Sequence, residues 1–381
     1  MQPPQVDPTL PETDDRQLVT GGSQGLASAN DRHATAFHSY CFRSPRERHA
    51  FVGRRAELDR LEAYRAEAEA GRPAMVIVQA APGFGKTALL TEFGLSLTGW
   101  HYVDAAGDEG EARLPFGLLD RLGKAMRPGA SIDGPRDPFT EGASFLQWLG
   151  DLEESGPVAV VVDDAQWADL PSLLALTFAL RRLRVDRVLT VLALRAEDAY
   201  RLPTGLVRLV QDRGARVELS GLSPDEIRNL GVAMGHGRPT RRIAEQLHKH
   251  TGGSPLYLTA LLAETPPGAF RRRRHLLPAP RSFGFQVRAA LEARSRQCRR
   301  LVEAAAVLGM HCALGLAASV GEVTDPLTAL QDAQGTGLID AVHDADGWAI
   351  AFRHPIARAA VLDLLAGVSG LHSLSACFPL W

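Results

Sequence analysis

Two short segments of this sequence carry residues with the chemistry of a phosphate site. The first is Gly83-Phe84-Gly85-Lys86-Thr87, which follows the apolar run 75–80 and precedes a helix-favouring Ala-Leu-Leu. A glycine turn between a strand and a helix can aim successive backbone N–H groups at phosphate oxygens. Lys86 can reach the β- and γ-phosphates of a nucleotide, and the Thr87 hydroxyl can ligate Mg²⁺. The predicted phosphate loop consists of Pro82, Gly83, Phe84, Gly85, Lys86, Thr87 and Ala88.

The full pattern of such a loop begins with a glycine, and this chain has Ala80 at that position. The alternative interpretation is a glycine-rich turn with an incidental Lys-Thr. The strand before the turn and the helix after it are the context that the motif requires, so we favour the phosphate loop. The substitution at Ala80 leaves the fine geometry of the loop open.

The second segment is Asp163-Asp164, at the end of the apolar run 157–162. A carboxylate there lies on the same edge of a parallel sheet as the phosphate loop. Asp163 can hold Mg²⁺ directly or through water, and Asp164 can polarise an attacking water. The alternative is a turn that happens to begin with two aspartates. Arg195 ends the next strand and is either a contact to the γ-phosphate or a solvated strand-end arginine.

Composition narrows the class of protein. The chain has 381 residues and a net charge of −2, so the molecule as a whole is not an electrostatic binder of nucleic acid. No apolar run approaches the ~18 residues of a membrane helix, and the acidic, proline-containing N-terminus is not a secretory signal. The cysteines form no C-x-x-C pair, which predicts a reduced, cytoplasmic protein without a zinc site. They are Cys41, Cys298, Cys312 and Cys377.

The chain divides into segments of different character. Residues 1–45 are rich in Pro, Gly, Ser, Asp and Gln and are predicted to be disordered. Across 46–221 apolar strands alternate with helices, which predicts an α/β domain with a parallel sheet. The remaining expected segments are helices in 222–265, a basic linker in 266–284, a compact unit in 285–365 and an irregular tail in 366–381.

Within the α/β domain the expected strands are 75–80, 101–105, 157–162, 187–194 and 216–219. The expected helices are 56–62, 87–97, 115–126, 140–154 and 171–184. Ser223-Pro224-Asp225-Glu226 predicts the start of a further helix, because it combines a capping box with proline at the first helical position.

With both sites placed, the phosphate loop and five further segments in order resemble the LuxR-type large ATP-binding regulators. This group is a branch of the STAND signalling NTPases, related to AAA+ and Orc1-like ATPases. The most specific segments are the phosphate loop and Asp163-Asp164-Ala165-Gln166-Trp167-Ala168-Asp169. The other matching segments are 51–58, 114–119, 251–258 and 352–361. The resemblance covers about residues 50–365 and implies a P-loop NTPase domain, a helical lid over 222–265 and a winged-helix domain over 285–365.

The resemblance also implies roles for individual residues. Val52, Gly53 and Arg54 correspond to a motif near the nucleotide. Pro255 would lie against adenine, and His354 would contact the nucleotide, although a helix-cap or core histidine is the alternative. The segment Asp163–Asp169 corresponds to the family's Walker B region, and Trp167 is expected to pack the loop within it. Ser254 stands where the family has asparagine, which weakens any side-chain role there.

The implied function is a signalling switch with ATP or ADP and Mg²⁺ as cofactors, in which slow hydrolysis acts as a timer. The resemblance also allows for an inducer or a partner protein, whose identity stays open. No LuxR-type helix-turn-helix segment occurs, so this chain alone is not expected to bind DNA sequence-specifically. The alternatives are an Orc1-like motor or loader and a truncated, non-functional fragment. A motor normally needs an arginine from a neighbouring subunit. The available candidates are Arg201, Arg208 and Arg213.

A basic stretch from Arg271 to Arg300 contains Glu292 as its one acid. It could bind a phosphate backbone. A solvated linker and helix face is the favoured interpretation, because the stretch has no pattern of interleaved aromatic residues that suggests base stacking.

Overall fold

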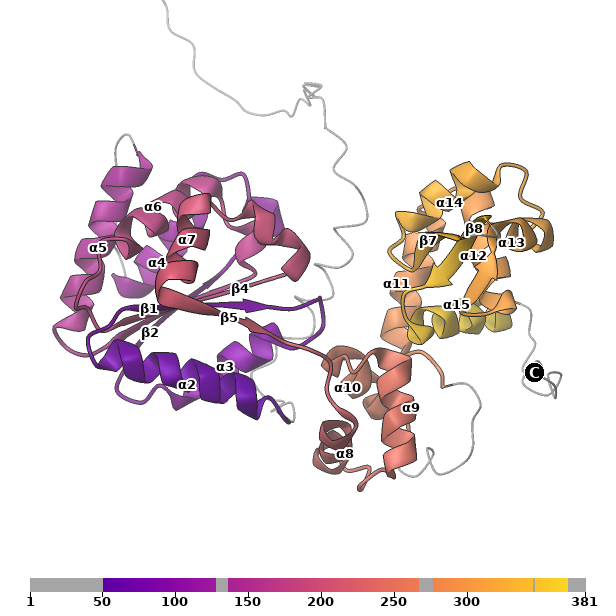
Figure 1. The fold of residues 1–381 in the computed structure, drawn as a ribbon, viewed down its shortest axis with the longest axis horizontal. Helices are drawn as coiled ribbons and strands as arrows, with labels where there is room; N and C mark the ends of the chain where they lie inside the picture. Colours follow the sequence, from indigo (N-terminus) through magenta and orange to yellow (C-terminus); the bar gives the residue numbers. More distant parts are fainter. Residues whose placement is uncertain (1–50, 128–135, 267–276, 345–346, 369–381) are drawn as a thin grey trace, which may run out of the picture.

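The computed structural model describes residues 51–127, 136–266, 277–344 and 347–368 (Figure 1). The segment 1–45, most of the tail 366–381 and residues Arg271 to Arg274 lie outside this part of the chain, so the predictions for them are not tested. None of the described helices is both long enough and apolar enough to cross a membrane.

A five-stranded parallel sheet forms the centre of the first domain, as predicted. The strand order is β2-β3-β4-β1-β5, so β4 lies between β1 and β3. Its continuous apolar strands are buried on both faces, which is typical of parallel sheets covered by helices. The strands are β1 (Ala74–Gln79), β2 (His101–Ala106), β3 (Val158–Asp163), β4 (Val188–Leu194) and β5 (Gly214–Glu218).

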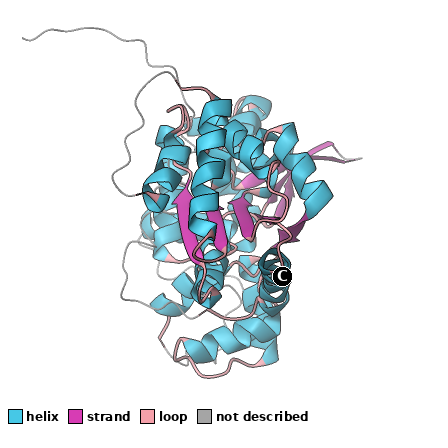
Figure 2. Cartoon of the chain, turned by 90° about the vertical axis from the view of Figure 1, so that its left-hand side faces the viewer, coloured by secondary structure: helices cyan, strands magenta, loops and turns pink. Residues whose placement is uncertain are grey.

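Helices cover both faces of this sheet (Figures 1 and 2). Alternate strand residues enter two separate cores: Val76 and Val161 face α2 and α3, whereas Ile77 and Val160 face the other layer. The first layer holds α2 (Arg55–Glu69) and α3 (Lys86–Ser96). The second holds α4 (Gly117–Met126), α5 (Pro138–Glu153), α6 (Leu170–Leu180) and α7 (Thr204–Arg213).

Helix α7 was not predicted from the sequence. It follows Pro203 and contains Gly205, both of which are typical of loops. Its buried residues Leu206, Leu209 and Val210 pack into the second core, so tertiary burial outweighs its weak intrinsic preference for helix.

Three helices follow the sheet domain and share a small core of their own. They are α8 (Pro224–Ala233), α9 (Arg241–Thr251) and α10 (Pro255–Glu264). The capping box predicted at Ser223 is present: its hydroxyl accepts from the backbone N–H of Glu226, whose carboxylate accepts from the backbone N–H of Ser223. The role of this unit as a lid stays a prediction.

The last unit packs five helices around a three-stranded antiparallel sheet of order β6-β8-β7. Helix α11 begins at Arg281, inside the predicted linker 266–284, so that linker ends earlier than expected. The assignment as a winged helix stays a prediction. The elements are α11 (Arg281–Glu292), α12 (Arg296–Leu308), β6 (His311–Ala313), α13 (Leu314–Val320), α14 (Pro326–Gln334), β7 (Ile339–Asp344), β8 (Gly347–Phe352) and α15 (Pro355–Val368).

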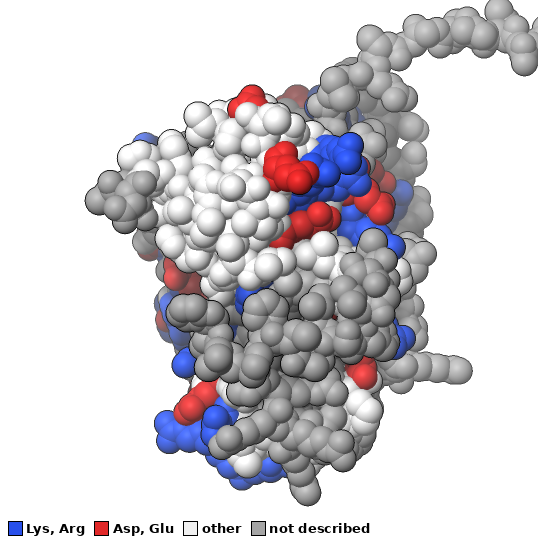
Figure 3. Space-filling view, turned by 90° about the vertical axis from the view of Figure 1, so that its right-hand side faces the viewer, with Lys and Arg blue, Asp and Glu red and all other residues white. Residues whose placement is uncertain are grey.

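Two of the described arginines of the basic stretch have acidic partners from further along the chain. Arg294 lies 3.4 Å from Asp332, and Arg300 lies 3.0 Å from Glu322. In the space-filling view of this end of the molecule, basic and acidic side chains lie side by side and most of the described face is uncharged (Figure 3). Acidic residues other than Glu292 therefore lie beside the stretch. Because they offset the charge of Arg294 and Arg300, the interpretation as a solvated helix face is favoured for these two arginines.

A buried carboxylate joins α4 to the loop after β3. Asp169 is 3% exposed and caps α6, where it accepts hydrogen bonds from the backbone N–H and the hydroxyl of Ser172. It also accepts from the backbone N–H groups of Phe116 and Leu118 at the start of α4. One carboxylate thus satisfies donors at the N-termini of two helices.

We predict that Asp169→Ala destabilises the fold by about 2–4 kcal/mol, because it leaves several buried donors without an acceptor. The free energy of unfolding in urea measures this loss. Asp137→Ala is the matched control, since Asp137 caps α5 at an exposed position, and it should cost less. Equal losses of unfolding free energy in the two variants would show that Asp169 stabilises the fold no more than an ordinary helix cap does.

A second prediction concerns His250, which is 7% exposed and whose Nε2 lies 3.0 Å from the carbonyl oxygen of Pro278. Burial lowers the pKa of His250 below its ordinary 6.5, although the Pro278 carbonyl opposes this. As pH falls, the imidazole therefore binds its proton in the unfolded chain before it does so in the folded protein. The stability that neutral His250 provides above pH 6.5 is lost as pH falls below that value.

Wild-type protein should lose more unfolding free energy than His250→Gln between about pH 7.5 and about pH 5.5, because glutamine does not titrate there. Urea titrations at both pH values measure the difference. The same loss in both proteins would assign the pH dependence to other groups.

Candidate functional site

The predicted phosphate loop connects β1 to α3 at the carboxyl edge of the sheet. Gly83 and Gly85 have φ of 78° and 87°, a region that side chains disfavour. Helix α3 begins directly after Gly85, and no side chain caps its first turn. Its backbone N–H groups are therefore not used by a capping side chain, which suits an anion. Pro82 is exposed, and Phe84 packs against the core under α2 and α3.

Ala80 continues the strand pairing instead of opening the turn. Its N–H donates to the carbonyl oxygen of Leu194, and it is not among the described residues with positive φ. A Cβ is tolerated in this extended conformation. The departure from glycine therefore leaves the loop without backbone strain at Ala80.

Lys86 is 3% exposed and turns back over the loop. Its Nζ donates to the carbonyl oxygens of Ala80 at 3.1 Å and Ala81 at 3.4 Å. Burial lowers the pKa of Lys86, and the nearby carboxylates of Asp164 and Asp163 oppose that effect. A buried ammonium group held by neutral carbonyls is well placed to gain from an anionic ligand.

The structure brings the two predicted metal-binding residues together. Thr87 Oγ1 donates to Asp163 Oδ2 at 2.5 Å, across β4. Both groups supply hard oxygen atoms, the type that Mg²⁺ prefers. Ala88 follows in the first turn of α3 and is half-buried.

Asp164 and Arg195 end neighbouring strands and share a partner that the sequence analysis did not identify. Gln166 Nε2 donates to Asp164 Oδ1 at 2.9 Å, and Gln166 Oε1 accepts from the backbone N–H of Arg195 at 3.2 Å. Trp167 is 7% exposed and lies under the guanidinium groups of Arg195 and Arg201, 5.6 and 4.9 Å from its ring centroid. This packing agrees with the structural role predicted for Trp167.

Arg54 ties the segment before α2 to the loop. Its side chain is 5% exposed, and Nη2 donates to the carbonyl oxygens of Phe84 at 3.0 Å and Ser220 at 2.6 Å. Its backbone N–H donates to the carboxylate of Glu226 on α8. Gly53 has φ of 76°, and Val52 packs on the core of α8–α10. This segment thus touches both the phosphate loop and the helical unit.

The start of α10 lies directly on the phosphate loop. Ser254 Oγ donates to the carbonyl oxygen of Gly83 at 3.0 Å, and the backbone N–H of Leu256 donates to the same oxygen at 3.2 Å. Pro255 Cγ lies 3.7 Å from where a Cβ on Gly85 would stand. The hydroxyl of Ser254 therefore contacts the loop backbone, and whether serine weakens the side-chain role relative to asparagine stays a prediction.

His354 lies against the helical unit. Its Nδ1 and Cε1 are 3.4 Å from where a Cβ on Gly252 would stand. Gly252 directly follows α9 and lies two residues before Ser254, whose hydroxyl contacts the phosphate loop. His354 is therefore connected to the loop through the segment from Gly252 to Ser254. Partial burial and the guanidinium of Arg353 lower the pKa of His354, whereas Asp340 raises it.

Three contacts at the site were missed because their sequence signals are weak. Gln166 and Glu226 are ordinary polar residues within motifs that were interpreted for other positions. Gly107 packs so closely that a Cβ would stand 2.3 Å from the carbonyl oxygen of Asp164. A glycine just after β2 is the one signal that could have indicated this close approach.

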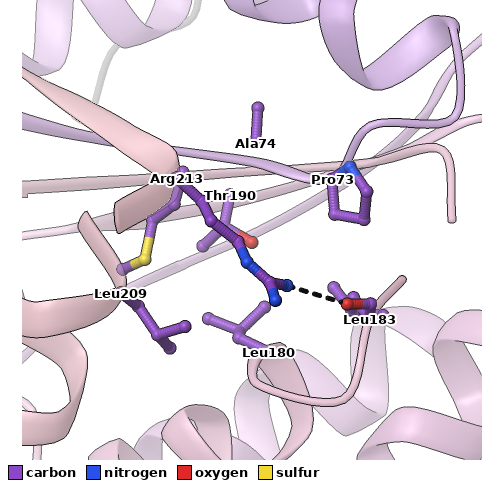
Figure 4. Close-up of a pocket in the computed structure, with 8 residues that line it drawn as sticks. Pro73, Ala74, Leu180, Leu183, Thr190, Leu209 and Arg213 are labelled. Carbon is purple, nitrogen blue, oxygen red and sulfur yellow. Dashed lines mark hydrogen bonds between the residues drawn. The ribbon is translucent and has the colours of Figure 1, made fainter. Parts of the chain in front are cut away.

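The small cavity in Figure 4 lies at the opposite edge of the sheet. It has a volume of about 20 Å³, enough for one water, and borders Thr190, whose buried hydroxyl has no partner among the described residues. Arg213 lines it and donates to the carbonyl oxygen of Leu183. This places Arg213 away from the phosphate loop.

Comparisons of the sequence and the fold with known proteins agree with this geometry. Residues 50–191 match the sequence model of the AAA ATPase domain. No curated protein sequence matches the chain. The ORC2 protein of Aeropyrum pernix, solved in ADPNP–ADP complexes, has a similar fold with a TM-score of 0.52 and 15% identity over 85% of this chain and 97% of that one.

Two further structures match less closely. Cdc6p from Pyrobaculum aerophilum gives a TM-score of 0.45 and 14% identity over 85% of this chain and 97% of that one. A STAND protein with a tetratricopeptide repeat sensor from Pyrococcus horikoshii gives a TM-score of 0.39 and 17% identity over 88% of this chain and 47% of that one. Residues 50–191 are therefore similar to AAA ATPase domains in sequence, and the parallel sheet of this part of the chain agrees with that similarity.

Proposed function

We propose that this chain is an ATP-binding signalling switch, the nucleotide-sensing part of a LuxR-type transcriptional regulator, with slow ATP hydrolysis. The observation that carries the proposal is the pair of hydrogen bonds from Ser254 and Leu256 to the carbonyl oxygen of Gly83. Phosphates bound by the loop act on the backbone that holds α10. A nucleotide that favours one loop arrangement therefore shifts the position of the helical unit.

Nucleotide phosphates would be held by Lys86 and the N-terminus of α3. Thr87 and Asp163, already in contact, fit Mg²⁺ by the chemistry of their oxygens. The ion, when bound, would neutralise phosphate charge. In the proposed switch, α8–α10 are the lid, α11–α15 correspond to the winged helix, and Pro255 faces adenine.

Hydrolysis would use Asp164 as the residue that accepts a hydrogen bond from the attacking water. The water oxygen would form a bond to the γ-phosphorus as the bond to the β-phosphate oxygen breaks, so that ADP leaves and the water proton ends on the released phosphate. Arg195 would contact the γ-phosphate. Because no trans-acting arginine is part of this proposal, slow turnover is expected, whereas rapid multiple turnover would favour the motor alternative.

The first test is nucleotide affinity. Lys86→Ala removes a buried positive charge and should weaken ATP and ADP binding by about 2–4 kcal/mol in titration calorimetry with Mg²⁺. Lys124→Ala, at an exposed position on α4, is the control and should bind as wild type does. Equal affinity of the Lys86 variant would refute the phosphate loop.

The second test is the chemical step. Asp164→Asn keeps the size of the side chain and tolerates the left-handed backbone at this position, where φ is 45°. It should keep nucleotide affinity and lower the single-turnover rate by about 10²-fold or more. Asp151→Asn on the surface of α5 is the control. An unchanged rate in Asp164→Asn would remove this residue from the mechanism.

The third test is coupling through His354. If the last unit closes on the ADP-bound lid, His354→Ala should reduce the thermal stabilisation by ADP more than that by a non-hydrolysable ATP analogue. His343→Ala is the control, since His343 packs on Trp348 within the β7–β8 hairpin. Equal shifts with both nucleotides in wild type and variant would show that His354 plays no part in the switch.

A further inference from the structure

Gln166 is a buried side chain placed between the two candidate catalytic residues. It is 3% exposed and belongs to the short 3₁₀ helix Ala165–Trp167 after β3. Its amide nitrogen donates to Asp164 Oδ1 at 2.9 Å, and its amide oxygen accepts from the backbone N–H of Arg195 at 3.2 Å. One planar group therefore connects the end of β3 to the end of β4.

The backbone at Asp164 adopts a left-handed conformation, which neighbouring contacts must stabilise. Asp164 has φ of 45° and ψ of 43°, in the left-handed region that an ordinary side chain seldom adopts. Its carbonyl oxygen accepts from the backbone N–H of Trp167 at 2.9 Å, and Gly107 approaches it from β2. These contacts hold the main chain, whereas rotation about the side-chain bonds of Asp164 is limited by the contacts of the carboxylate itself.

The contacts of Gln166 restrict that rotation, and they need an amide. A carboxamide is both a donor and an acceptor, so it can serve a carboxylate on one side and a backbone N–H on the other. A glutamate here would place a second negative charge beside Asp164. A methionine of the same length would make neither hydrogen bond. On its other side, Gln166 holds the backbone nitrogen of Arg195, which is bonded to the Cα that carries the Arg195 side chain.

We propose that Gln166 is a positioning residue for hydrolysis: it sets the orientation of the Asp164 carboxylate and ties it to the start of Arg195. The inference rests on the proposed function, because it assumes that Asp164 acts on the attacking water. Gln166 itself contacts neither nucleotide nor water in this scheme. A purely structural link between β3 and β4 is the competing explanation.

The test measures binding and chemistry separately in Gln166→Met. We expect the Kd of a non-hydrolysable ATP analogue to stay within about twofold of wild type and the single-turnover rate of ATP hydrolysis to fall by about 10–100-fold. Gln166→Glu keeps the side-chain length and the acceptor for Arg195, and it should be at least as slow. It also serves if the methionine variant does not fold.

Thr177→Val is the matched control for lost buried polarity. Thr177 is 7% exposed on α6 and donates to the carbonyl oxygen of Leu173, away from the loop. It should lower the melting temperature without changing the hydrolysis rate. If Gln166→Met behaves in the same way, the residue is structural and the proposal is overturned.

A double-mutant cycle decides whether Gln166 acts through Asp164. In an Asp164→Asn background, adding Gln166→Met should cause no further loss of rate, because the group it orients is already disabled. Multiplicative losses would overturn the proposal. If Asp164→Asn hydrolyses ATP as wild type does, the proposed mechanism fails and the inference fails with it. If Asp164→Asn is inactive but Gln166→Met and Gln166→Glu are normal, the inference alone fails.

Discussion

The hydrogen bond between Thr87 and Asp163 is the contact on which the candidate site depends. It joins side chains 76 positions apart in the sequence and on opposite sides of β4. The parallel sheet makes it available, because β1 and β3 end at the same edge and their following loops meet above β4. Any shift in the register of β4 against either neighbour would separate the phosphate loop from the carboxylates.

Several buried polar side chains lie at this edge of the sheet, and the free energy of removing them from water must be offset by other interactions. Asp169, Gln166 and Arg54 are each at most 5% exposed, and each is held by several hydrogen bonds. Burying such groups without partners would be expensive, so the bonds are a condition for their presence. In return, each of them links segments that are distant in sequence, which fixes one arrangement of the loops.

A series of direct contacts connects the candidate nucleotide site to the later units. The carbonyl oxygen of Gly83 holds α10 through Ser254 and Leu256, and Arg54 joins Phe84 of the loop to the N-terminal side of α8 through Glu226. His354 of the last unit lies against Gly252 at the end of α9. In the proposed switch, a change at the loop would reach the helical unit first and then the unit that follows it.

The sequence by itself determined the elements with strong local signals. The apolar runs at β1, β3 and β4, the glycine turn before Lys86 and the capping box at Ser223 all depend on neighbouring residues, so the fold class and the turn between β1 and α3 were predictable. Helix α7 was not, because proline and glycine mask a helix that burial stabilises.

Tertiary structure alone decided the strand order and the contacts between distant segments. Nothing local places β4 between β1 and β3, brings the hydroxyl of Ser254 onto Gly83 or turns the amide of Gln166 toward Arg195. Such contacts depend on which faces of the elements pack together, and that is set by the sum of many weak apolar interactions across the domain. A pattern of a few residues identifies chemical groups, but their mutual positions belong to the whole fold.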